Sequence, residues 1–133
     1  DPVVVAPHAT GVARAKELLD ALTALFDEAE AKAASRAAAE AGDDEVVVAR
    51  PSARERGVPT PTLAVLLPTR DAASGMKRHE LIGTVEGREV IMVDSIIDSG
   101  GTIARGATEL KARGAKRVFA FATHGLFTGA PEK

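Results

Sequence analysis

Four short runs of apolar residues, each free of charged side chains, constrain the fold of this chain more than any other feature. A strand with one solvated face alternates apolar and polar residues, whereas a strand covered on both faces of a parallel sheet is apolar throughout. A fifth run, Val46–Ala49, has the same character. We therefore expect strands of a largely parallel sheet at Val3–Ala6, Leu63–Leu67, Val90–Val93 and Val118–Ala122.

Two amphipathic segments separate these runs. Apolar residues recur every three to four positions from Gly11 to Phe26 and again from Thr102 to Arg113, and Gly114 suits the turn that ends the second helix. The order strand, helix, strand, strand, helix, strand predicts an α/β fold, a parallel-rich sheet flanked by helices. A length of 133 residues fits one domain, residues 1–133.

The stretch from residue 28 to 61 has a different composition. Eight of the fourteen residues from Glu28 to Ala41 are Ala, which favours a helix but offers little to bury. Pro and charged residues then dominate up to Pro61. We expect residues 28–61 to form a surface insertion; the alternative is an ordinary helix and loop of the core. The short segment Met76–Glu80, which contains His79, is expected to be a solvated run of charges.

Composition excludes several classes of protein. The net charge is −2 and the only aromatic residues are four Phe, which argues against a nucleic-acid surface. No apolar run approaches the roughly 20 residues that span a bilayer. The chain has no Cys, which excludes disulfides, iron–sulfur clusters and a thiol nucleophile. It opens as a strand rather than a targeting segment, so a cytoplasmic location is expected, with an organelle left open.

The segment Glu89–Thr102 carries the chemistry. An apolar strand ends at Asp94, and a short loop with Gly100 and Gly101 leads into a helix. Glycines let backbone N–H groups approach a phosphate, and the helix N-terminus adds partial positive charge. A carboxylate at a strand end is placed to accept hydrogen bonds from ribose hydroxyls. The pattern predicts a sugar-phosphate site; the alternative is a plain turn with a capping hydroxyl.

This segment resembles the phosphoribosyl pyrophosphate-binding loop of the type I phosphoribosyltransferase fold. More narrowly, the chain is similar to the carboxy-terminal domain of ribose-phosphate pyrophosphokinase (phosphoribosyl pyrophosphate synthetase). The resemblance covers residues 2–26 and 63–131, and beyond the loop it rests on three ordered segments: Val3–Ala15, Ile82–Arg88 and Gly114–Gly129.

The resemblance implies a set of roles. Asp94 would hold a ribose hydroxyl, and Arg70 would match the Arg of a Lys-x-Arg pair that acts in catalysis. The family reaction uses Mg²⁺, ATP and ribose 5-phosphate, yields phosphoribosyl pyrophosphate, and takes place in homo- or hetero-oligomers of synthetase-family subunits. The family's amino-terminal ATP-binding half has no counterpart in these residues. The 5-phosphate would be cradled by Asp98, Ser99, Gly100, Gly101 and Thr102.

Three positions depart from the family pattern. Pro68 stands where a Lys is usual, Ser95 replaces the second Asp of an acidic pair, and His8 aligns with an Asp that helps to hold magnesium. His8 could still bind a metal, although imidazole is a softer ligand than a carboxylate. These departures leave two hypotheses: a synthetase-family subunit with impaired catalysis, and a non-catalytic regulatory or assembly paralogue. A phosphoribosyltransferase acting on a base would need a recognition segment that the sequence does not show.

Overall fold

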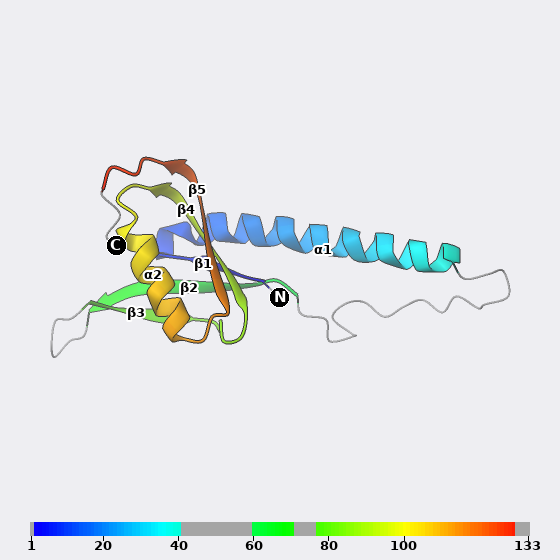
Figure 1. The fold of residues 1–133 in the computed structure, drawn as a ribbon, viewed down its shortest axis with the longest axis horizontal. Coiled ribbons are helices and arrows are strands. Elements are labelled where there is room, and N and C mark those ends of the chain that lie inside the picture. The colour runs from blue at the N-terminus through cyan, green and yellow to red at the C-terminus, as the bar shows by residue number, and fades with distance from the viewer. Residues whose placement is uncertain (1, 41–59, 71–76, 130–133) are drawn as a thin grey trace.

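Five strands form one mixed sheet in the computed structural model, which describes residues 2–40, 60–70 and 77–129 (Figure 1). The strand order is β3-β2-β1-β4-β5, and every neighbouring pair is parallel except β2 and β3. The elements are β1 (Pro2–Ala6), α1 (Val12–Glu40), β2 (Thr62–Arg70), β3 (Lys77–Ile82), β4 (Glu89–Ile97), α2 (Gly101–Ala112) and β5 (Arg117–Gly125).

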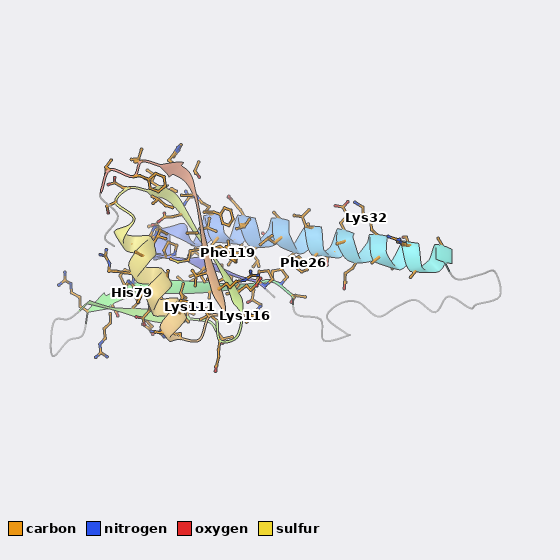
Figure 2. All side chains as sticks on the ribbon, viewed as in Figure 1. Phe26, Lys32, His79, Lys111, Lys116 and Phe119 are labelled. Atoms are coloured by element: carbon orange, nitrogen blue, oxygen red, sulfur yellow. The ribbon has the colours of Figure 1, made fainter. Side chains whose placement is uncertain are left out.

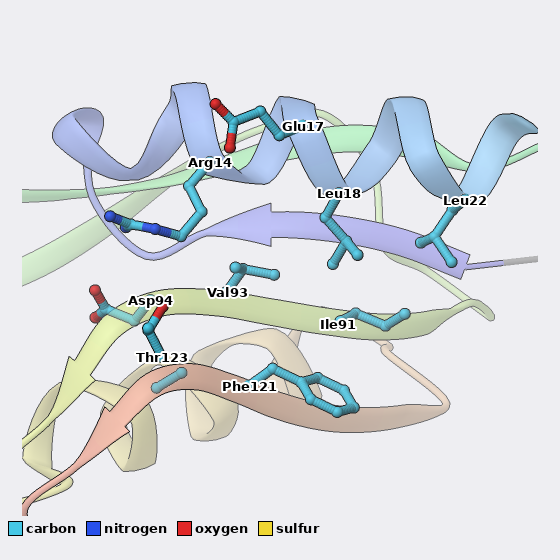
Figure 3. Close-up of a pocket in the computed structure, with 10 residues that line it drawn as sticks. Arg14, Glu17, Leu18, Leu22, Ile91, Val93, Asp94, Phe121 and Thr123 are labelled. Carbon is cyan, nitrogen blue, oxygen red and sulfur yellow. The ribbon is translucent and has the colours of Figure 1, made fainter.

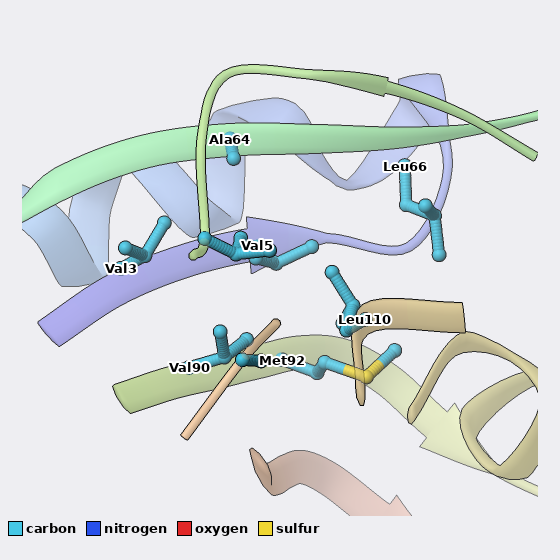
Figure 4. Close-up of a cluster of buried hydrophobic side chains, with 9 residues drawn as sticks. Val3, Val5, Ala64, Leu66, Val90, Met92 and Leu110 are labelled. Atoms are coloured by element: carbon cyan, nitrogen blue, oxygen red, sulfur yellow. The ribbon is translucent and has the colours of Figure 1, made fainter. Parts of the chain in front are cut away.

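All four predicted strands are present, and the predicted α/β class is confirmed. The central strand β1 explains the absence of alternation, because Val3, Val4 and Val5 are all fully buried. Val3 and Val5 point to a core shared with Leu66 and Leu110 under α2 (Figure 4). Val4 instead belongs to a second core, under α1. The two helices therefore cover opposite faces of the sheet.

The expected run of solvated charges at Met76–Glu80 forms part of a strand where the structure describes it, and Arg78 and Glu80 are exposed there. Lys77–Ile82 forms strand β3, which pairs antiparallel with β2 from Val65 to Arg70. This strand lies at the edge of the sheet, where charged side chains are tolerated and discourage further pairing. The strand was not predicted because its sequence is mostly polar, whereas the predicted strands were identified as apolar runs.

Helix α1 is longer than the predicted segment ending at Phe26. Residues 28–40 of the expected insertion continue it to 29 residues, and this half extends beyond the sheet (Figure 1). Lys32, on this extension, pairs only locally with Glu28, one turn back (Figure 2). Residues 41–59, including the predicted strand Val46–Ala49, lie outside the described residues. None of the described helices is long and apolar enough to cross a membrane.

Candidate functional site

The candidate site begins where the parallel neighbours β1 and β4 end. His8 follows β1, and Asp94 lies near the carboxyl end of β4. The Nε2 atom of His8 stands 3.2 Å from Oδ1 of Asp94. Because a carboxylate only accepts, Nε2 carries the proton, and Nδ1 accepts from the hydroxyl of Thr10 at 2.8 Å. The sheet thus brings together two residues that the sequence had proposed for separate roles.

Asp94 is held firmly in this position. The residue is 7% exposed, and its Oδ1 also accepts from the backbone N–H of Ser95 at 2.7 Å. The carboxyl group lies at the polar end of a cavity of about 450 Å³, beside Arg14 and Thr123 (Figure 3). The hydrogen bonds from His8 and Ser95 matter because a buried carboxylate without a partner is costly. The geometry leaves Asp94 oriented toward the carboxyl edge of the sheet.

The predicted loop after β4 forms a sharp turn into α2. Gly100 precedes the helix with φ 79° and ψ −9°, a left-handed conformation that favours glycine. Gly100, at the N-cap position, has no side chain to cap the helix, and the N–H of Gly101 donates a long hydrogen bond to Oγ of Ser99, with 3.5 Å between nitrogen and oxygen. The first N–H groups of α2 and the positive end of its dipole therefore point to this edge. Gly101 and Thr102 form its first turn.

Arg105 is a charged group near this loop that the sequence analysis missed. A Cβ atom added at Gly101 would lie 3.3 Å from Nη1 and 3.4 Å from Nη2 of Arg105, so the guanidinium folds back over the helix start. Its sequence position could have indicated this place, because Arg105 follows Gly101 by four residues and residues four apart are neighbours on a helix. A guanidinium at this place adds two or more donors for an anion.

The segment after β5 supports the loop from the other side. The hydroxyl of Thr128 donates to the carboxylate of Asp98, and the N–H of Leu126 donates to the carbonyl of Ile97 at 2.9 Å. The Asp98 side chain is thus engaged in bracing the loop. A carboxylate would repel a phosphate, so any contact from residue 98 to an anion must come from its backbone.

The remaining predicted residues do not complete a metal site. Within residues 2–40, 60–70 and 77–129 there is no group of three or more His, Cys, Asp or Glu side chains that could hold a metal ion. His8 and Asp94 offer one nitrogen and one carboxylate, an incomplete set for Mg²⁺, which prefers oxygen. Arg70 and Pro68 both lie exposed on β2. Pro68 is beyond the segment of β2 that pairs with β1, so its missing N–H costs no bond to that strand.

These features define an α/β domain with a glycine turn and an uncapped helix start at the carboxyl edge of a parallel sheet. The chain belongs to the phosphoribosyl synthetase-associated domain family, which it matches over residues 2–133. It is 38% identical to a ribose-phosphate pyrophosphokinase from Vibrio vulnificus (strain YJ016) over all 133 residues. It is 46% identical over 71 residues, 53% of the chain, to one from Pasteurella multocida (strain Pm70), of which it covers 22%.

A solved structure shares this fold. The phosphoribosylpyrophosphate synthetase from Mycobacterium smegmatis matches 95% of this chain with 27% identity and a TM-score of 0.56, while the match covers 28% of that chain. The chain likewise spans 31% of the Vibrio vulnificus relative. The family and the fold are thus established, and they agree with the resemblance seen in the sequence.

Proposed function

We propose that this domain binds ribose 5-phosphate and phosphoribosyl pyrophosphate at the turn between β4 and α2. The main support is the coincidence of the left-handed Gly100, the uncapped start of α2 and the guanidinium of Arg105 over Gly101. Backbone N–H groups from Ser99 to Thr102 would receive the 5-phosphate, and Asp94 would accept from a ribose hydroxyl. The names of the relatives support this substrate class.

The same proposal includes impaired catalysis. In the synthetase reaction a diphosphoryl group moves from ATP to the sugar, and such transfers depend on charge stabilisation by cations and metal. In this chain the position expected to carry a Lys is Pro68, and Arg70 is left as the one basic residue of that pair. His8 is hydrogen-bonded to Asp94 and Thr10 through both ring nitrogens. Any Mg²⁺ would therefore rely on phosphate oxygens and water for most of its ligands.

A second candidate is a non-catalytic regulatory or assembly subunit that associates with active synthetases in the cytoplasm. The bond between His8 and Asp94 favours it, because an imidazole engaged in this way fixes the site without supplying the charge that the family's Asp would bring. Both candidates require the sugar-phosphate site. They differ in whether ATP and ribose 5-phosphate are turned over.

Calorimetry with ribose 5-phosphate tests the shared part. The unmodified chain should bind, and Arg105→Gln should weaken binding about tenfold or more, the scale of one charge-assisted contact. Arg113→Gln is the matched control, since Arg113 lies at the opposite end of α2 and bonds Glu109. Gly101→Val should also weaken binding, because its side chain would displace the guanidinium of Arg105. No binding by the unmodified chain, or equal binding by all four proteins, would contradict the proposal.

A further inference from the structure

The side chain of Asp98 bonds a distant hydroxyl instead of the backbone N–H groups nearest to it in the sequence. Asp98 precedes Gly100, the N-cap residue of α2, by two positions and Gly101 by three. An Asp side chain commonly accepts from the N–H groups two and three residues further along, which caps a helix start. Here the Asp98 carboxylate accepts instead from the hydroxyl of Thr128, 30 positions away. A long-range bond thus replaces the local bond that Asp98 favours.

The segment of residues 126–129, which we call the strap, places Thr128 against the loop before α2. A main-chain hydrogen bond to the end of β4 holds the start of the strap. Phe127 has φ 49°, a left-handed conformation that bulky residues seldom adopt, and it turns the chain just before Thr128. A Cβ atom added at Gly129 would lie 3.0 Å from Cβ of Ser99, so the strap lies directly on the loop. The position of Thr128 is therefore fixed by its backbone.

A released Asp98 carboxylate would compete with a phosphate for the same donors. The first N–H groups of α2 and the positive end of its dipole attract any anion, whether it is a ligand or a side chain. The guanidinium of Arg105, folded over Gly101, adds to this attraction. A side chain tethered two or three residues away is also present at a high effective concentration, which favours it over a dilute ligand. The bond from Thr128 to Asp98 therefore keeps the donors available.

We propose that Thr128 is a positioning residue for phosphate binding, and that its hydroxyl holds the Asp98 carboxylate away from the start of α2. Without this hydroxyl, Asp98 turns to the N–H groups of Gly100 and Gly101 and takes the place of the anion. The inference rests on the proposed sugar-phosphate site and adds a residue outside the loop that sets its affinity. Thr128 acts through Asp98 and does not touch the ligand.

Amide NMR of the ligand-free chain tests the movement of Asp98. In Thr128→Val the amide proton of Gly100 or Gly101 should shift as the Asp98 carboxyl titrates, because that N–H now donates to it. The shift should be clearly larger than in the unmodified chain or in Thr128→Ser, and Asp98→Ala added to Thr128→Val should abolish it. Equal shifts in Thr128→Val and the unmodified chain would overturn the proposal, whatever ligand the site binds.

Calorimetry with inorganic phosphate and with ribose 5-phosphate tests the consequence for binding. Thr128→Val should weaken both about fivefold or more, the scale of one capping bond, whereas Thr128→Ser keeps the hydroxyl and should stay within about twofold. Thr108→Val is the matched control, because Thr108 is exposed on α2 and its hydroxyl donates to the carbonyl of Ala104 in the same helix. Equal losses in Thr128→Val and Thr128→Ser, or in Thr128→Val and Thr108→Val, would contradict the proposal.

The variant Asp98→Ala separates positioning from simple support of the loop. Alone it should bind phosphate about twofold or more tighter, because it removes a charge of the same sign as the ligand. Thr128→Val should have no further effect in the Asp98→Ala background, whereas loss of a structural support would weaken binding in both backgrounds. Circular dichroism shows whether each variant is folded. An equal loss with and without the Asp98 carboxylate would overturn the proposal. If the unmodified chain binds neither ligand, the proposed function fails, and the amide titration alone decides whether Thr128 holds Asp98.

Discussion

His8 donates a hydrogen bond to Asp94, 86 positions away in the sequence, and so links the end of β1 to the end of β4. The two strands are parallel neighbours, and both contribute their carboxyl ends to the candidate site. The same imidazole accepts from Thr10. The loop after β1 and the carboxylate of β4 therefore hold each other in place before any ligand binds.

Removing this link should lower stability. We expect His8→Ala to reduce the free energy of unfolding by about 1–2 kcal/mol, because the nearly buried Asp94 loses a donor but keeps the N–H of Ser95. Urea denaturation followed by circular dichroism measures the change. His124→Ala is the control, since His124 is exposed and should stay within about 0.5 kcal/mol. Equal losses in the two variants would show that the bond contributes nothing.

Two glycines of the turn between β3 and β4 offer a paired test of backbone and packing constraints. Gly83 has φ +107°, and a Cβ there would lie 2.8 Å from Cβ of Ala64, whereas Gly87 has φ +68° and open space around it. Gly87→Ala should therefore cost about 1–2 kcal/mol from its left-handed backbone alone. Gly83→Ala should cost clearly more, because strain and overlap with β2 add. Thermal unfolding of both variants provides the comparison, and a smaller loss at Gly83 would contradict it.

Burial explains which parts of this fold could be predicted from the sequence. Val3, Val4 and Val5 are fully buried on both faces of β1, so their uninterrupted apolar character identified the strand. Strand β3 is an edge strand with the sequence Lys-Arg-His-Glu-Leu-Ile, and no apolar periodicity identified it. The second half of α1 extends beyond the sheet (Figure 1), and the propensity of its Ala residues favoured a helix there.

In the candidate site, too, some features could be predicted from the sequence and others could not. The turn at Gly100 and the helix start at Gly101 follow from local residue types, and both were predicted within one residue. The contacts of Asp94 with His8, and of Asp98 with Thr128, join residues 86 and 30 positions apart. Such contacts depend on the order of strands in the sheet, which no local pattern specifies. The place of Arg105 over Gly101 depends on a side-chain rotamer, which the sequence does not give.

The ion pair between Glu89 and Arg117 predicts a specific pH dependence. The hydrogen bond from Arg117, assisted by its charge, lowers the pKa of Glu89. A carboxyl whose pKa is lowered by folding stabilises the fold above its ordinary pKa, and this contribution is lost as the pH falls through the lowered pKa. Arg117→Gln should therefore move the NMR titration midpoint of the Glu89 carboxyl upward. It should also flatten the fall in stability at acid pH.

The control for this titration is Lys116→Gln. It removes the same charge from the neighbouring residue but no hydrogen bond to Glu89, and the attraction of Lys116 is the smallest of the influences that lower the pKa of Glu89. In Lys116→Gln the titration midpoint of the Glu89 carboxyl should shift upward by less than it does in Arg117→Gln. Equal shifts in the two variants would mean that net charge, rather than the hydrogen bond, sets the titration.

The final prediction concerns activity and follows from the charge that a transferring diphosphoryl group carries. Several negative charges must be met by cations as the group leaves ATP. In this chain Pro68 offers no charge, Ser95 is a hydroxyl, and His8 is hydrogen-bonded to Asp94. With ATP, ribose 5-phosphate and Mg²⁺, the purified chain should form no detectable phosphoribosyl pyrophosphate in a sensitive coupled assay. Turnover of about 1–10³ per second, the usual range of enzymes, would contradict this. A triple variant that combines Pro68→Lys, His8→Asp and Ser95→Asp tests whether these positions cause the lack of activity. Activity in the triple variant but not in the unmodified chain would assign the deficit to these three positions.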